Sequence, residues 1–391
     1  MYDIIVVGGG HAGVEAALAS ARLKNKTLLL VGNKKMIASM PCNPSIGGPA
    51  KGIIVREIDA LGGEMAKATD KTLLQIKMLN VSKGPAVRAL RAQSDKIQYP
   101  KYMQAVIEQQ ENLEVREIYV ERLLLADNEV IGVELENKEQ IKAKIVIIAS
   151  GTYLDSRILV GHKFWQSGPD NQRTTSKLSE SLKEAGLKLI RLKTGTPPRI
   201  KKNTIDFSKT VEQPGDNRPL RFSETTNFEE IRPIEKQEKC YLTYTTEETH
   251  KIINDNLTSS SMYSGIIKGV GPRYCPSIEA KVVLFSDKKK HQVFLEPESL
   301  EIDEIYVQGL STSLPHELQI EMVHTVPGLE KAEIAKYAYA IEYDAIDPLQ
   351  LKATLESKSI KNLFFAGQVN GTSGYEEAAC QGLIAGINAS L

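Results

Sequence analysis

The chain has 391 residues, and its 49 lysines and arginines balance its 49 aspartates and glutamates, so its formal net charge at pH 7 is zero. This balance excludes binding of a partner through bulk charge alone. At roughly 150 residues per domain, the length predicts about two or three domains, and the 41% apolar and 25% charged residues are typical of a folded globular protein. The sequence has no run near the ~18 consecutive apolar residues of a membrane span. It also has Asp3 where a leader peptide would be basic, and its cysteines and histidines show no zinc-ligand spacing. We therefore expect a cytoplasmic protein without a membrane span, a metal site or a disulfide framework.

The first 31 residues predict a strand, a tight turn, a helix and a second strand. Apolar runs cover residues 2–7 and 27–31, and an alanine-rich stretch covers residues 14–23. The turn consists of Gly8, Gly9, Gly10, His11, Ala12 and Gly13. In a Gly-x-Gly-x-x-Gly turn of this kind, Gly8 permits the sharp bend, Gly10 lets a pyrophosphate approach the backbone, and Gly13 lets the helix pack closely. The pattern predicts a dinucleotide site at the start of a helix.

One usual feature of such sites is absent from the sequence. An acidic residue about 20 residues after the glycines normally binds the ribose, but Val31, Gly32 and Asn33 occupy that place. Asn33 is a candidate replacement.

The rest of the chain predicts the fold class. Residues 113–151 alternate apolar and polar residues in several short strands, and residues 362–371 predict a strand and turn followed by a helix over 374–389. This arrangement resembles flavoproteins that bind two dinucleotides. We expect an α/β protein with a Rossmann-like FAD domain (residues 1–151 and 351–391) and an inserted second α/β domain (residues 152–350). The polar residues 201–239 predict long surface loops in the insertion.

Residues 82–102 are the strongest basic segment. We interpret it as partly helical, with Arg88 and Arg91 on one helix face. Binding of RNA phosphates and internal salt bridges are equally compatible with its basic residues, which are Lys83, Arg88, Arg91, Lys96 and Lys101.

Two cysteines lie in glycine- and proline-rich loops that also contain cations. Cys42 precedes Lys51 by nine positions, and Cys275 follows Arg273 by two. Since cationic neighbours favour the nucleophilic thiolate, we predict that Cys42 and Cys275 are functional. A cysteine is more often a small buried apolar residue, and we expect this for Cys240 and Cys380.

Six stretches, in order along the whole chain, carry a resemblance to one family. They are GGGHAGVEAALASARL, PCNPSIGGPAKG, NVSKGPAVRALRAQSDK, RLKTGTPPRI, GPRYCPSIEAKVVLF and AGQVNGTSGYEEAACQGLIAGINA. With these stretches the chain resembles the tRNA uridine 5-carboxymethylaminomethyl modification enzymes, the glucose-inhibited division protein A family. The resemblance implies an FAD-dependent, homodimeric enzyme that is reduced by NADH and takes a one-carbon unit from methylenetetrahydrofolate. It also implies action on the wobble uridine of tRNA together with a tRNA-modification GTPase, with no membrane or DNA partner.

The resemblance also assigns site residues. It implies FAD contacts at Gly8 to Gly13, Val120, Thr175 and Gln368. It implies an NADH-binding segment made of Gly271, Pro272, Arg273, Tyr274, Cys275, Pro276, Ser277, Ile278, Glu279, Lys281 and Phe285.

The chemistry of uracil suggests roles for the thiols. Addition of a thiolate to C6 makes C5 nucleophilic toward a one-carbon electrophile. One of Cys42 and Cys275 would add to C6 and the other would assist, while Lys51 or Arg273 would stabilise negative charge. Two alternatives stay open: a folate- and FAD-dependent tRNA uracil C5-methyltransferase, and a non-catalytic flavoprotein scaffold that docks the GTPase. The family continues past Leu391 into a helical region, so we expect this chain to bind RNA and the GTPase less tightly.

Overall fold

A computed structural model of the chain describes residues 1–271 and 276–391. The largest sheet formed by these residues has seven strands. Its parallel part runs in the order β6 (Leu113–Glu117), β2 (Thr27–Val31), β1 (Tyr2–Val7), β9 (Gln140–Ile148), with β20 (Leu363–Phe365) also paired to β9. The antiparallel part adds β8 (Glu129–Leu135) and β7 (Val120–Ala126) to β9. Since β20 comes from the far end of the chain, both ends build one Rossmann-like sheet, as predicted.

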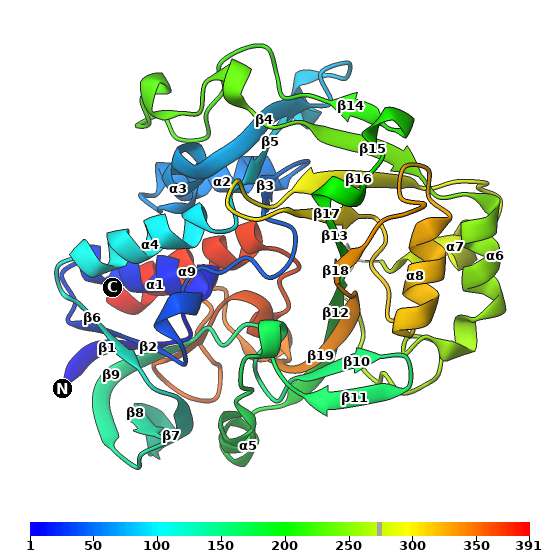
Figure 1. The fold of residues 1–391 in the computed structure, drawn as a ribbon. Helices are drawn as coiled ribbons and strands as arrows, with labels where there is room; N and C mark the ends of the chain where they lie inside the picture. Colours follow the sequence, from blue (N-terminus) through cyan, green and yellow to red (C-terminus); the bar gives the residue numbers. More distant parts are fainter. Residues whose placement is uncertain (272–275) are drawn as a thin grey trace.

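Helices cover one face of the parallel part of this sheet, and the β7–β8 ribbon packs against the other (Figure 1). One face carries α1 (His11–Arg22), α4 (Gln98–Gln109) and α9 (Tyr375–Ser390), with α2 (Lys51–Ala60) and α3 (Met65–Thr72) beyond them. The opposite face packs against the β7–β8 ribbon and α5 (Ser176–Glu184). The apolar runs Ile4 to Val7 in β1 and Leu28 to Val31 in β2 follow from this arrangement, because a parallel strand is buried on both sides.

A small antiparallel sheet, in the order β3 (Ser45–Gly47), β5 (Ala89–Ser94), β4 (Leu73–Leu79), follows the first βαβ unit. It corrects one prediction: Arg91 lies on strand β5, and Arg88 directly precedes that strand, so the two arginines share no helix face. Arg91 pairs with Glu296 and Lys101 with Glu301. The sequence of the basic segment is compatible with RNA binding or with internal salt bridges. For Arg91 and Lys101, the structure shows internal salt bridges.

The middle of the chain forms two further antiparallel sheets. The first runs in the order β11 (Lys163–Gln166), β10 (Arg157–Val160), β19 (Tyr339–Ile346), β12 (Leu189–Thr196). The second runs β14 (Val211–Gln213), β15 (Cys240–Tyr244), β16 (Gln292–Pro297), β17 (Glu304–Gln308), β13 (Arg199–Lys201), β18 (Ile334–Lys336). Its apolar core is closed by α6 (Glu247–Asp255), α7 (Ile278–Leu284) and α8 (His316–His324), at the right of Figure 1.

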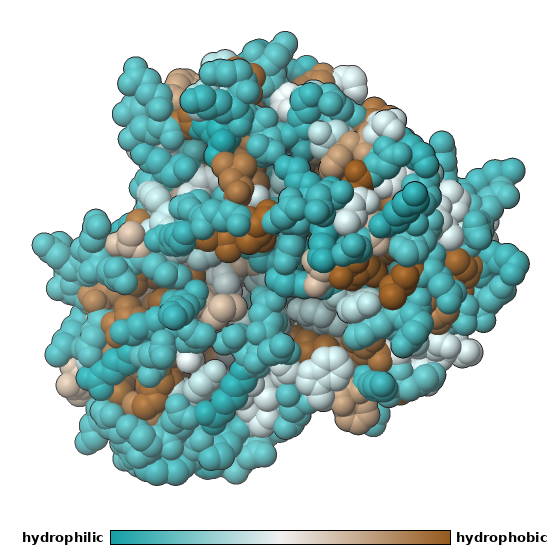
Figure 2. Space-filling view, viewed as in Figure 1, coloured by the Kyte–Doolittle hydropathy of each residue, from teal (hydrophilic) through white to brown (hydrophobic). Residues whose placement is uncertain are grey.

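Hydrophilic side chains cover most of the face shown in Figure 2, with apolar patches scattered among them. Across residues 1–271 and 276–391, the structure contains no helix whose length and apolar character would suffice to span a membrane.

Candidate functional site

The glycine turn after β1 has the geometry that its spacing predicts. Gly8 has φ +109°, and a Cβ there would lie 2.3 Å from the carbonyl oxygen of Ala149. A Cβ on Gly13 would lie 1.8 Å from the carbonyl oxygen of Gly8, so α1 packs directly on the turn. A Cβ built on Gly10, in contrast, meets no heavy atom of the described residues within 4 Å. Gly8 and Gly13 are required by packing, whereas Gly10 borders open space at the helix N-terminus.

Polar groups around this space fit a dinucleotide. The first N–H groups of a helix have no partner within it, and Gly10 offers α1 no side-chain cap. The buried Ser150 Oγ, Asn370 Oδ1 and Thr372 Oγ1 have no hydrogen-bond partner within the described part of the chain. Ser150 follows β9, and Asn370 and Thr372 follow β20, so all three lie beyond the carboxyl ends of parallel strands, where ligands of such sheets bind. The two hydroxyls can donate to phosphate oxygens, whereas Asn370 Oδ1 accepts and needs a donor such as a ribose hydroxyl of the ligand.

Two buried residues on α1 lie beside the glycine turn. The His11 ring is 4.4 Å from the ring of Tyr375 and 5.5 Å from that of Tyr99, between centroids. Burial lowers the pKa of His11 to about 4, so the imidazole is neutral near pH 7. One turn later, burial raises the pKa of the Glu15 carboxyl to about 7. The N-terminus of α1 attracts a phosphate here, and the neutral His11 adds no charge to that attraction.

The other predicted FAD residues lie in different surroundings. Gln368 lies in a short 3₁₀ helix, Gly367–Asn370, where a Cβ on Gly367 would lie 2.7 Å from Ala12, so this segment borders the glycine turn. Val120 is buried at the start of β7. Thr175 precedes α5, and both its N–H and its hydroxyl bond to the carbonyl of Tyr153.

Asn33, the candidate for the ribose, caps a short 3₁₀ helix by accepting the N–H of Lys35. Its amide also donates to Gln172 at 3.2 Å.

Cys42 is half-buried, between the start of α9 and strand β17. Its N–H donates to the Tyr375 hydroxyl at 2.9 Å, and its Sγ lies 3.1 Å from the Tyr306 hydroxyl. The guanidinium of Arg199 donates to the carbonyl of Pro41 at 2.6 Å. The peptide bond between Pro41 and Cys42 is thus held at its carbonyl and at its N–H.

A buried ion cluster lies behind Cys42. Glu298 is fully buried, and one of its carboxylate oxygens accepts from Arg199 at 3.3 Å and from Lys96 at 3.0 Å. Burial alone would lower the pKa of Arg199, but the Glu298 carboxylate raises it well above its usual range. Arg199 is therefore a permanent cation close to the thiol.

Lys51, predicted to stabilise charge, contacts α9. Its ammonium lies 3.2 Å from a carboxylate oxygen of Glu376 and 3.2 Å from one of Glu377. Burial alone would lower its pKa, but these carboxylates raise it. Lys51 connects the Cys42 loop region to the helix that follows the Gln368 segment.

The sequence model of the family described as "Glucose inhibited division protein A" matches residues 3–391. The chain belongs to this family. Over 390 residues it is 60% identical to "tRNA uridine 5-carboxymethylaminomethyl modification enzyme MnmG" of Geobacillus kaustophilus, and over 388 residues it is 59% identical to the Bacillus subtilis protein of that name. It spans 61% of the length of each of these relatives, while 100% and 99% of the chain are matched. The solved structure of Aquifex aeolicus GidA is 51% identical, with a TM-score of 0.95, over 100% of this chain and 65% of that one.

The segment that the GidA family resemblance assigns to NADH is only partly described. Pro272, Arg273, Tyr274 and Cys275 lie outside the described residues, so the predictions for them stay predictions. Ser277 caps α7 by accepting the N–H of Ala280.

Beyond this cap, Ile278 and Glu279 are fully buried, Lys281 is half-buried and Phe285 is exposed. Glu279 Oε1 accepts from Ser260, Thr312 and the N–H of Ser313. This network fixes the base of α7 within the insertion.

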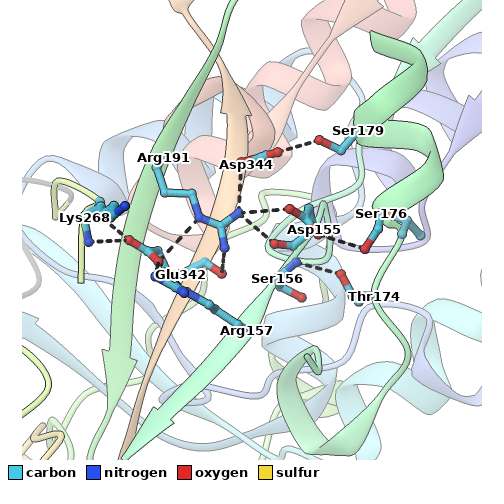
Figure 3. A network of polar contacts seen from close by, with 12 residues as sticks. Asp155, Ser156, Arg157, Thr174, Ser176, Ser179, Arg191, Lys268, Glu342 and Asp344 are labelled. Atoms are coloured by element: carbon cyan, nitrogen blue, oxygen red, sulfur yellow. Dashed lines mark hydrogen bonds and ion pairs between the residues drawn. The ribbon is translucent and has the colours of Figure 1, made fainter. Parts of the chain in front are cut away.

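A second buried network fixes the approach to that segment (Figure 3). Glu342, fully buried on β19, pairs with Arg157 at 2.6 Å and Arg191 at 3.5 Å, and accepts the N–H groups of Lys268 and Gly269. Arg191 begins the family stretch RLKTGTPPRI and also pairs with Asp344 at 2.9 Å. The ion pairs fix Glu342, and its hydrogen bonds hold residues 268–269 against the β10–β19–β12 sheet.

Several residues around Cys42 were not predicted. Arg199 and Tyr375 lie within the quoted stretches RLKTGTPPRI and AGQVNGTSGYEEAACQGLIAGINA, so these stretches could have suggested them. Tyr306 and Glu298 lie in none of the six, and only the three-dimensional fold brings them to the thiol.

Proposed function

We propose that this chain is the catalytic part of an FAD-dependent tRNA-modifying enzyme that installs a (carboxymethyl)aminomethyl group at C5 of the wobble uridine. One combination of features in a chain of this family carries the proposal. The glycine turn borders open space at Gly10, and the half-buried Cys42 lies next to the buried cation Arg199. NADH as reductant, methylenetetrahydrofolate as one-carbon donor, the partner GTPase and a homodimer rest on the family resemblance alone. A tRNA substrate implies a cytoplasmic location.

FAD would lie with its pyrophosphate on the first N–H groups of α1, beside Gly10 and near Gln368. When bound, it would supply two-electron redox chemistry. The residues of the chain would orient it: Gly10 by leaving room for the phosphates, and Ser150, Asn370 and Thr372 by hydrogen bonding.

Covalent chemistry on the base falls to a thiol, one of Cys42 and Cys275. The thiolate would form a bond to C6 of uracil, which places the electron pair at C5. C5 would bond to the methylene carbon that a folate nitrogen carries, the C5 proton would leave, and the S–C6 bond would break to restore the thiolate. An amine, glycine by the family resemblance, would then bond to this carbon as its bond to the folate nitrogen breaks and tetrahydrofolate leaves. For Cys42, Arg199 is the cation available to stabilise the negative charge.

The test is tRNA modification by purified, FAD-loaded protein supplied with unmodified tRNA, NADH, methylenetetrahydrofolate, glycine, GTP and the GTPase, with nucleosides quantified by mass spectrometry. Cys42→Ser should lower the rate by more than about a thousandfold, as expected for loss of a nucleophile, with flavin content unchanged. Cys380→Ala is the matched control, because Cys380 lies on α9 and outside the Cys42 loop. Full activity of both C42S and Cys275→Ser would contradict the covalent role of the thiols.

A further inference from the structure

The Tyr306 hydroxyl, 3.1 Å from Cys42 Sγ, suggests a residue that acts on the thiol. Tyr306 is 1% exposed, and Cys42 lies 264 positions away in the chain. A hydroxyl and a thiol can each donate this hydrogen bond. Once the sulfur has lost its proton, however, only the phenol can donate, and a hydrogen bond to the charged form stabilises that form.

Arg199 connects to both partners of this contact. Its guanidinium carbon lies 4.8 Å from the centroid of the Tyr306 ring, within the range of a cation–π interaction. One of its nitrogens donates to the carbonyl of Pro41, the residue before Cys42. A cation over the ring draws electron density from the phenol, which makes its O–H a stronger donor. The same arginine therefore fixes the loop of the thiol and favours donation from its hydrogen-bond partner.

Other groups that interact electrostatically with Cys42 come from different elements. Tyr375 at the start of α9 accepts the backbone N–H of Cys42, and Tyr339 lies at the start of β19. Burial raises the pKa of both phenols, so both are neutral near pH 7. Neither compensates a charge on the sulfur, whereas Tyr306 and Arg199 do.

We propose that Tyr306 is a positioning residue that holds the Cys42 sulfur and donates a hydrogen bond to its thiolate, with Arg199 fixing both groups. The proposal rests on the proposed function in one respect, that Cys42 is used as a thiolate. It concerns the reactivity of the thiol itself, which is measurable without tRNA.

The experiment follows alkylation of Cys42 by iodoacetamide as a function of pH in the FAD-loaded protein, with each cysteine quantified by peptide mass spectrometry. In Tyr306→Phe, the pH midpoint of Cys42 alkylation should rise by about one unit, so that the rate below the midpoint falls about tenfold. Tyr241→Phe is the matched control: Tyr241 lies on β15 of the same sheet and packs against Phe207. Equal profiles for Y306F and Y241F would overturn the proposal.

A second measurement covers the case in which Y306F loses flavin or folds poorly. Site-specific 4-aminophenylalanine at position 306 keeps the ring and a donor that stays un-ionised near neutral pH but donates more weakly than a phenol, so the pH midpoint should rise by less than it does in Y306F. A midpoint that stays or falls would overturn the proposal. The two ideas fail separately: a C42S protein that still modifies tRNA would contradict the covalent role of Cys42, while the shift in Y306F would stand.

Discussion

At the scale of single residues, burial of ionisable groups beside the glycine turn is the most consequential feature. Glu15 is 1% exposed, and its carboxylate accepts the N–H groups of Glu64 and Met65, which begin α3. Burial raises its pKa to about 7, although these hydrogen bonds work in the other direction. The carboxyl thus couples the pH to the contact between α1 and α3.

The sign of this coupling follows from linkage. The pKa is about 7 in the folded chain and 4.5 for an unperturbed glutamate, so between these values the folded state binds a proton that the unfolded state lacks. The contribution of Glu15 to stability is therefore complete below pH 4.5 and is lost as the pH rises through about 7. Glu15→Gln keeps an acceptor for both N–H groups and removes the titration.

We expect the free energy of unfolding of E15Q, relative to that of the unmodified chain, to rise by about 3 kcal/mol from pH 4.5 to pH 7 and to stay level above. Urea unfolding at each pH measures this difference, and other titrating groups cancel in it. A difference that does not change with pH would show that Glu15 is ionised in the folded chain.

At the scale of elements, the packing of α9 on α1 joins the two ends of the chain. A Cβ on Gly382 would lie 2.0 Å from the carbonyl oxygen of Ala12, and one on Gly386 would lie 2.6 Å from that of Ala16. The glycines are one helical turn apart on α9, as the two alanines are on α1, so the helix backbones approach along one stripe of small residues. This contact holds α9, and the Gln368 segment before it, against the glycine turn.

Gly382→Ala should force the helices apart and lower the free energy of unfolding by about 1–3 kcal/mol, the usual cost of overpacking. Flavin retention should fall as well, because α1 begins at the phosphate site. Gly84→Ala is the control, since a Cβ there meets no atom of the described residues within 4 Å. Thermal unfolding and flavin absorbance measure both effects; equal stability of the two variants would contradict the close approach.

Local patterns predicted the first βαβ unit, α9 and the short strands of residues 113–151, because each depends on neighbours a few residues apart. The helix expected around Arg88 and Arg91 is wrong because the extended conformation of β5 is set by pairing with β3 and β4, which no local spacing shows. The surroundings of Cys42 were only half predictable for the same reason. Its loop has a distinctive composition, whereas Tyr306 reaches it from a strand of the insertion.

At the scale of the whole molecule, the proposed function needs two regions of the chain to work together. The glycine turn belongs to the Rossmann-like sheet, whereas Lys281 and Phe285, predicted to bind NADH, lie at α7 of the insertion. The two regions meet through Cys42: its loop belongs to the first and its partners Tyr306 and Arg199 to the second. Hydride transfer from NADH to the flavin therefore tests the arrangement of the whole chain.

We expect NADH, mixed anaerobically with the FAD-loaded chain, to bleach the oxidised flavin band in stopped-flow absorbance. Lys281→Ala should raise the NADH concentration for half-maximal rate severalfold, because a cation that contacts the phosphates would be lost, while flavin content stays the same. Lys289→Ala is the matched control, since Lys289 is exposed and pairs with the exposed Glu247. Equal NADH dependence in K281A and K289A would remove Lys281 from the NADH site. If the flavin stays oxidised after NADH is added, reduction of the bound flavin by NADH is contradicted. That result would favour the scaffold alternative, in which the flavin fold serves to dock the GTPase.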